Sequence, residues 1–146
     1  IWYHIVMHEN FYHNVKVYYE DTDAGGIVYY ANYLKYLERS RTEALATIGL
    51  SNLKIKEKFG AHIIVKSCNI EYKKSAHLED ELSIRSFIKS VSKTSFYMNQ
   101  IITLGEITIV ETQFYLGVIN EMCKPVKVPN IIFDNFKPYF CDSIKF

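Results

Sequence analysis

The sequence predicts an α+β domain in which an antiparallel β-sheet packs against one long α-helix. Apolar residues recur at helical spacing over residues 31–48, and at two-residue spacing in several later segments that short polar turns separate. The chain has 146 residues, which suits one domain with a substantial core. We expect an N-terminal extension over residues 1–13 and a single domain over residues 14–146.

The first expected strand covers residues 14–19. Val15, Val17 and Tyr19 alternate there with more polar positions, as in a half-buried strand. A polar turn, Glu20-Asp21-Thr22-Asp23, follows the strand, and Gly25-Gly26 then allows a positive φ or a close backbone approach.

The long helix is expected to begin near Ala31 and to stop at Gly49. One face of it would hold Tyr33, Leu37, Ser40, Ala44 and Ile48, with Leu34, Arg41 and Leu45 beside them. After it, Ser51 can cap a short helix that Gly60 ends.

Four further strands are expected, over residues 64–72, 82–89, 96–102 and 107–119. Short turns between them suggest an antiparallel meander. Pro125 and Pro129 then break regular structure, and the tail would pack as a last turn or short helix. The helix can bury only one face of the sheet, so apolar side chains on the other strand positions favour a homo-oligomer.

Charge and cysteine content exclude several classes of protein. The formal net charge is +1, which gives no global basic field for nucleic acid. No run of eighteen apolar residues is present, so no membrane span is expected. Three widely separated cysteines, Cys68, Cys123 and Cys141, form no CxxC pair, which argues against a disulfide framework or zinc site and fits a reduced cytoplasmic setting.

The N-terminal segment gives no sign of targeting or of metal binding. Residues 1–6 lack the length and charge of a signal peptide, and Met7 is a candidate natural start. His4, His8 and His13 are spaced by four and five residues, but no acidic or cysteine partner has matching spacing. We therefore expect no metal site there.

The carboxylates of the polar turn lie just ahead of the long helix. A helix N-terminus has unsatisfied N–H groups and a positive dipole end, which can hold a developing oxyanion while a nearby carboxylate acts as nucleophile or base. The alternative is that these Asp residues only cap the turn or the helix, because Asp favours both places. Spacing alone leaves both interpretations open.

The stretch from Val17 to Tyr29, with Ala31-Asn32-Tyr33 and Glu38-Arg39-Ser40-Arg41-Thr42-Glu43, closely resembles the YbgC-like acyl-CoA thioesterases. These enzymes are relatives of 4-hydroxybenzoyl-CoA thioesterase in the hotdog-fold superfamily. The later segments Ile70-Glu71-Tyr72, Leu78-Glu79-Asp80 and Lys93-Thr94-Ser95 match as well, so the resemblance covers roughly residues 14–129.

The resemblance implies a hotdog fold, in which the sheet wraps one long central helix and subunits dimerise edge to edge and pair into tetramers. It implies hydrolysis of an acyl-CoA thioester at the dimer interface. The family's catalytic carboxylate falls on Asp23, and its carbonyl-polarising backbone N–H falls on Tyr30. Members usually have His where this chain has Tyr30, a change that leaves the N–H but puts any side-chain role in doubt.

The resemblance also suggests substrate-binding positions and partners. The expected substrate-binding residues are Gly26, Val28, Asn32, Lys89, Lys93 and Thr94, of which Lys89 and Lys93 are candidates for the CoA phosphates. No metal and no cofactor are expected. Acyl carrier protein is an alternative acyl donor, and relatives encoded beside the Tol-Pal system suggest work in lipid metabolism close to the inner membrane.

Two other functions compete with the thioesterase. A hotdog hydratase or dehydratase usually needs a His together with a carboxylate on the helix, and this chain has no His in the helix entry. A non-catalytic module that binds acyl chains or carrier protein would have no need of Asp23.

Overall fold

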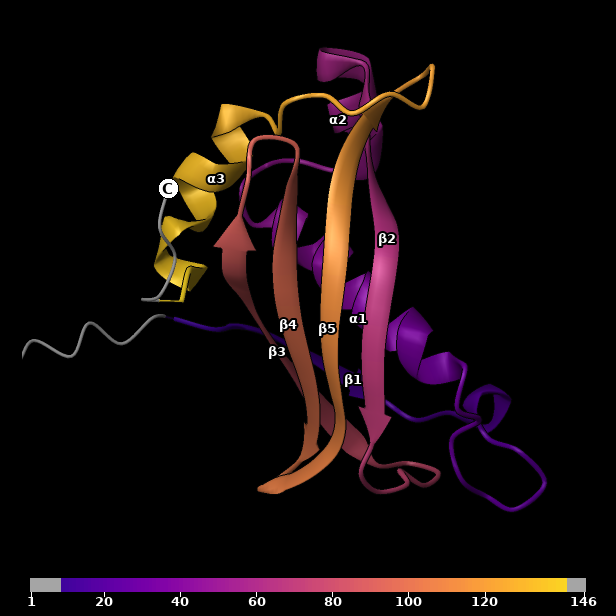
Figure 1. Cartoon of the computed structure of the whole chain (residues 1–146). Coiled ribbons are helices and arrows are strands. Elements are labelled where there is room, and N and C mark those ends of the chain that lie inside the picture. Colours follow the sequence, from indigo (N-terminus) through magenta and orange to yellow (C-terminus); the bar gives the residue numbers. More distant parts are fainter. Residues whose placement is uncertain (1–8, 142–146) are drawn as a thin grey trace, which may run out of the picture.

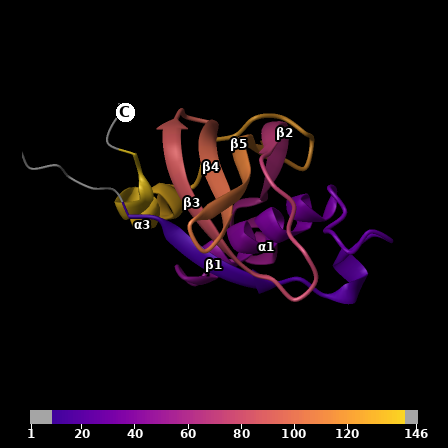
Figure 2. The ribbon, with the colours of Figure 1, turned by 90° about the horizontal axis from the view of Figure 1, so that it is seen from below.

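The computed structural model describes residues 9–141 and shows a five-stranded antiparallel sheet with the long helix α1 against one face (Figures 1 and 2). The expected α+β hotdog arrangement is confirmed. The elements are β1 (Phe11–Lys16), a 3-10 turn (Tyr19–Asp21), α1 (Asn32–Ala46), α2 (Asn52–Phe59), β2 (Ala61–Tyr72), β3 (Glu81–Val91), β4 (Ser95–Leu104), β5 (Ile107–Asn120), α3 (Asn130–Phe136) and a second 3-10 turn (Lys137–Tyr139).

The first strand differs from its prediction at both ends. β1 begins at Phe11, inside the expected N-terminal extension, and ends at Lys16. Val17 is fully buried, but Tyr19 is 80% exposed, so the alternation expected through Tyr19 is wrong at its end. The cause is local, because the Asp21 carboxylate accepts a hydrogen bond from the Tyr18 N–H at 2.9 Å and turns the chain. His4 and His8 lie outside the described residues, and His13 lies in β1.

α1 presents the expected face to the sheet, with one addition and one correction. Its buried residues are Asn32, Tyr33, Tyr36, Leu37, Ser40, Ala44 and Leu45. Tyr36 extends the buried stripe, whereas Leu34 is 41% exposed. The caps of α2 are confirmed: the Ser51 hydroxyl accepts from the Lys54 N–H at 3.1 Å, and Gly60 adopts a left-handed conformation.

The order of the strands is β1-β3-β4-β5-β2, which departs from the expected meander. β3, β4 and β5 are consecutive neighbours, but β2 pairs with β5, from Ala61↔Asn120 to Tyr72↔Val110. β1 pairs with β3 and so takes the position beside β3 that β2 would have in a meander. Within the described residues β2 is therefore an edge strand, with one side unpaired.

A buried polar network joins α1 to the sheet. Gln100 of β4 is fully buried, and its amide donates to the Leu37 carbonyl at 3.2 Å and to the Ser86 hydroxyl at 3.0 Å. Its side-chain oxygen accepts from Arg41 at 2.8 Å, and the Arg41 guanidinium lies 4.3 Å from the centre of the Phe114 ring. Burial lowers the pKa of Arg41. The network fixes the position of α1 on the sheet and satisfies the buried amide.

Candidate active site

The polar turn ahead of α1 closes as a tight loop between Thr22 and Val28, which form an antiparallel bridge. The Asp23 N–H donates to the Ile27 carbonyl at 2.9 Å, and Gly26 has a φ of +78°. Asp23 is exposed, and its Oδ1 accepts from the Gly25 N–H at 2.8 Å. A Cβ at Gly25 would lie 3.2 Å from this oxygen, so the turn favours glycine there. One carboxylate oxygen of Asp23 thus fixes the turn, as the capping interpretation expected.

The entry to α1 is tied to the same turn through the Asp21 carbonyl. That oxygen accepts from the Tyr29 N–H and from the Asn32 side-chain amide, both at 2.9 Å. The N-cap residue is Ala31, and no side chain caps the helix. None of the three carboxylates of the turn therefore caps α1, and Asn32 anchors the turn rather than capping. No side chain caps the start of α1, and the Asn32 and Leu34 N–H groups donate to the Tyr29 and Ala31 carbonyls.

An aromatic cluster surrounds the helix entry. The Tyr30 ring is 60% exposed and lies 4.9 Å from Tyr29 and 6.1 Å from Tyr72, centre to centre. Tyr33 is buried and lies 5.9 Å from Tyr72. Burial raises the pKa of Tyr33 and Tyr72, so both hydroxyls stay protonated at neutral pH. This cluster gives the helix entry a partly apolar wall.

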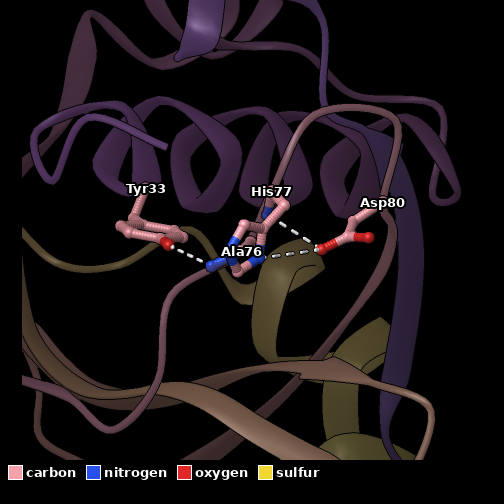
Figure 3. A network of polar contacts seen from close by, with 4 residues as sticks. All are labelled: Tyr33, Ala76, His77 and Asp80. Atoms are coloured by element: carbon pink, nitrogen blue, oxygen red, sulfur yellow. Dashed lines mark hydrogen bonds and ion pairs between the residues drawn. The ribbon is translucent and has the colours of Figure 1, made fainter. Parts of the chain in front are cut away.

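The loop between β2 and β3 lies directly against the turn, as Figure 3 shows in part. The Tyr33 hydroxyl accepts from the Ala76 N–H at 3.0 Å, and the Ala76 carbonyl accepts from the Val28 N–H at 2.9 Å. His77 bridges to Ile27, its N–H donates to the Asp80 carboxylate at 2.8 Å, and its Nδ1 lies 3.9 Å from the same oxygen. His77 is not among the site residues predicted from the sequence, because no local sequence pattern indicates that its loop reaches the turn.

The structure brings together some of the predicted substrate-binding residues and separates the others. Gly26 lies in the turn with Asp23, Val28 is buried in the core, and Asn32 is buried at the helix entry. Lys89 lies near the end of β3, and Lys93 and Thr94 lie in the turn between β3 and β4, which Figure 1 shows at the opposite end of the sheet from the entry to α1. β3 begins beside the His77 loop and runs eleven residues, so its far end lies about 35 Å away. Within one protomer these three residues cannot reach Asp23.

Between residues 9 and 141 no group of His, Cys, Asp and Glu side chains is arranged to hold a metal ion. None of the helices in this part of the chain has the length and apolarity that crossing a membrane requires.

Comparison with known proteins identifies the family. The model of the thioesterase-like superfamily matches residues 17–136. The chain belongs to this superfamily. It is 37% identical over 125 residues to an acyl-CoA thioester hydrolase YbgC of Escherichia coli, covering 84% of this chain and 92% of that protein. It is 39% identical over 126 residues to the acyl-CoA thioesterase YbgC of Helicobacter pylori, covering 80% and 92%.

Among solved structures, a probable thioesterase of Bartonella henselae has a TM-score of 0.80 and 30% identity, and covers 83% of this chain and 100% of its own. The resemblance to YbgC-like acyl-CoA thioesterases is therefore confirmed, and so is the expectation of an enzyme of the thioester hydrolase class. The individual roles of the site residues stay predictions.

Proposed function

We propose that this thioesterase hydrolyses an acyl-CoA to the free acid and CoA, with Asp23 as nucleophile or general base and the start of α1 as the oxyanion site. One observation supports this most directly. The exposed Asp23 carboxylate lies in a turn that hydrogen bonds tie to a helix start without a side-chain cap. Names of the YbgC relatives at 37–39% identity support the substrate class.

The proposed reaction uses this arrangement. The thioester oxygen accepts from the Tyr30 N–H, which stabilises the charge that develops on it. As general base, Asp23 takes a proton from water while the water oxygen bonds to the acyl carbon; the C–S bond then breaks and CoA leaves as thiolate. As nucleophile, Asp23 would first form an anhydride that water hydrolyses. In either route Oδ1 remains oriented by Gly25, and the second carboxylate oxygen reacts.

A homodimer through β2 would complete the site. β2 is a twelve-residue edge strand, and unpaired edges of this length favour pairing with another chain. Exposed apolar side chains lie along it, on α1 and just before α1, among them Tyr30, Leu34, Val65 and Tyr72. The CoA bound at one active site could then be contacted by Lys89, Lys93 and Thr94 only if these residues belong to another protomer. Pairing of two dimers would give the homotetramer.

Location and further partners are part of the same proposal. Cys68 and Cys123 form no disulfide, which suits a reduced cytoplasmic compartment. Acyl carrier protein as acyl donor, Tol-Pal-associated partners and a place in lipid metabolism at the inner membrane stay predictions. The competing function is a scaffold that binds acyl groups without hydrolysing them, and the apolar cavity described below would serve it equally well.

Release of free thiol from a panel of short, long and aromatic acyl-CoAs separates the two functions. Asp23→Asn keeps the shape of the side chain but removes nucleophile and base, so we expect it to lose most of the rate, on the order of 10²–10⁴-fold. Glu20→Gln, an exposed carboxylate of the same turn, is the matched control. If wild type is inert on the whole panel, or if Asp23→Asn equals wild type, the catalytic proposal fails and the scaffold becomes the better account.

A further inference from the structure

An apolar cavity of about 180 Å³ lies between α1, the edge strand β2, the strands β4 and β5, and α3. It is distinct from the Asp23 turn, none of whose residues lines it. Its apolar wall includes Ile63, Val65, Met98, Leu116, Ile132 and Phe136.

The cavity has an open end and a closed end. Val65 of β2 is 48% exposed, and Glu38 and Asn52 beside it are also exposed, so the cavity opens along the seam between α1 and β2. At the other end, Ile132 and Phe136 of α3 are 1% and 5% exposed. α3 therefore forms the floor of the cavity.

Three of the polar side chains that line the cavity, Glu38, Arg41 and Thr42, already have hydrogen-bond partners. Arg41 already donates to Gln100 and stacks on Phe114, and Thr42 donates to the Glu38 carboxylate at 2.7 Å. The floor offers only hydrocarbon and aromatic surface. Such a cavity favours an apolar group, because a polar group placed there would lose its hydrogen bonds to water.

The deep part of the cavity lies far from the Asp23 of its own protomer. Ala44, which lines it, lies twelve residues beyond the start of α1, a distance of about 18 Å along the helix. If β2 pairs antiparallel with β2 of a second copy, the Tyr72 end of that copy lies beside the Ile63–Val65 end of this one. Tyr72 contacts Tyr30, so the helix entry of the second copy comes to the cavity mouth.

We propose that this cavity receives the hydrocarbon end of the acyl group whose thioester is held at the helix entry of the second protomer, and that Ile132 and Phe136 of α3 limit its length. The proposal rests on the dimeric thioesterase proposed above. A cavity of about 150 Å³ lined by apolar side chains is large enough to bind benzene. The preferred acyl group is therefore a single aromatic ring or an aliphatic chain of roughly six carbons.

The test measures kcat/KM for acyl-CoAs of increasing length and for benzoyl-CoA, together with calorimetric binding of non-hydrolysable thioether analogues of the same series. Phe136→Leu and Ile132→Val enlarge the floor while keeping apolar side chains. We expect each to move the preferred length upward by about one or two carbons, with roughly a fourfold gain for each newly buried methylene. Thr42→Phe narrows the mouth and should weaken every substrate except the shortest.

Asp134→Ala, on the exposed side of α3, is the matched control and should leave the length profile unchanged. Thermal unfolding of each variant shows whether it is folded. Ile132→Val and Thr42→Phe change the cavity independently of Phe136, so if one variant fails to fold, the other two still test the proposal. A profile that none of the three cavity variants moves overturns the proposal.

The two readouts separate the cavity from the catalytic proposal. If the analogues bind with a length limit that the floor variants shift, but no substrate is hydrolysed, the cavity assignment stands and the thioesterase activity fails. If hydrolysis is observed and the floor variants do not change its dependence on acyl length, the activity stands and the cavity assignment is wrong. If nothing is hydrolysed or bound, both are wrong.

Discussion

The side-chain amide of Asn32 donates a buried hydrogen bond of 2.9 Å to the main-chain carbonyl of Asp21, eleven residues earlier. This bond joins the first residue of α1 to the turn that holds Asp23. The Tyr29 N–H donates to the same oxygen, so one carbonyl sets the position of both the carboxylate turn and the helix start. The chemistry proposed here depends on that common anchor.

Replacement of Asn32 tests the anchor. In Asn32→Ala the Asp21 carbonyl keeps only the Tyr29 N–H, and we expect a loss of about 0.5–1.5 kcal/mol in the free energy of unfolding. kcat/KM should fall as well, because a shift of about 1 Å at a catalytic group can cost up to about 10²-fold. Urea unfolding and thiol release measure the two effects. Asn135→Ala, which removes an exposed amide from α3, should change stability by less than about 0.5 kcal/mol. Equal behaviour of the two variants would contradict the anchoring role.

The proposed oxyanion donor can be removed without removing the turn. Tyr30→Pro deletes the backbone N–H at the second residue of the turn that the Asn32 N–H closes on the Tyr29 carbonyl, a turn position that proline favours. We expect a fall in kcat of about 10²–10³-fold. Tyr30→Ala removes the aromatic ring but keeps the N–H, so it should retain far more of the rate. If Tyr30→Ala is as slow as Tyr30→Pro, the aromatic ring of Tyr30 rather than its N–H is needed for catalysis.

Two buried tyrosines make stability depend on alkaline pH. Burial raises the pKa of Tyr36 above its ordinary value near 10, and the Asp21 carboxylate raises it further; burial likewise raises the pKa of Tyr33. The native state therefore retains protons that the unfolded chain loses above pH 10. Their contribution is complete below pH 10 and is lost as the pH rises through the native pKa values.

Tyr36→Phe removes one of the two titrations, so its stability should fall less steeply above pH 10. Among the described residues the Tyr36 hydroxyl has no well-formed hydrogen bond, so at pH 7 this variant should be at least as stable as wild type. Denaturant unfolding at pH 8–11 measures both effects, with Tyr19→Phe, on an 80% exposed side chain, as control. If the stability of Tyr36→Phe falls as steeply with pH above pH 10 as that of wild type, the assignment of this titration to Tyr36 is wrong.

Introduction of a charge at the edge strand tests the proposed dimer. Ser67 is exposed near the middle of β2, where a two-fold antiparallel pair would bring it close to its own copy. Ser67→Lys and Ser67→Glu should each weaken the dimer, because like charges across a strand pair repel, and mixing the two should restore it. Light scattering after size exclusion gives the mass. Asn14→Lys, at the opposite edge in β1, is the control. Failure of the mixture to recover would argue against pairing through β2.

The sequence was most informative where structure is local. The stripe from Tyr33 to Ala44, the Ser51 and Gly60 caps and the alternation of burial along β3 and β4 all follow from hydrogen bonds or periodicity within a few residues, whereas the alternation expected along β2 is absent. The carboxylate turn before α1 was predicted as a unit, and its resemblance to a family assigned Asp23. The error at Tyr19 has a local cause too, since the Asp21 carboxylate turns the chain early.

The tertiary structure alone decided which distant segments meet. It placed β2 at the edge rather than beside β3, set His77 against the turn, and separated Lys89 and Lys93 from Asp23 by the length of the sheet. It also formed the cavity over α3. These features depend on which apolar faces pack against one another between segments that are far apart in the sequence. A hydrophobic period of two or 3.6 residues predicts the apolar face of a strand or helix, but it does not predict which other element that face packs against.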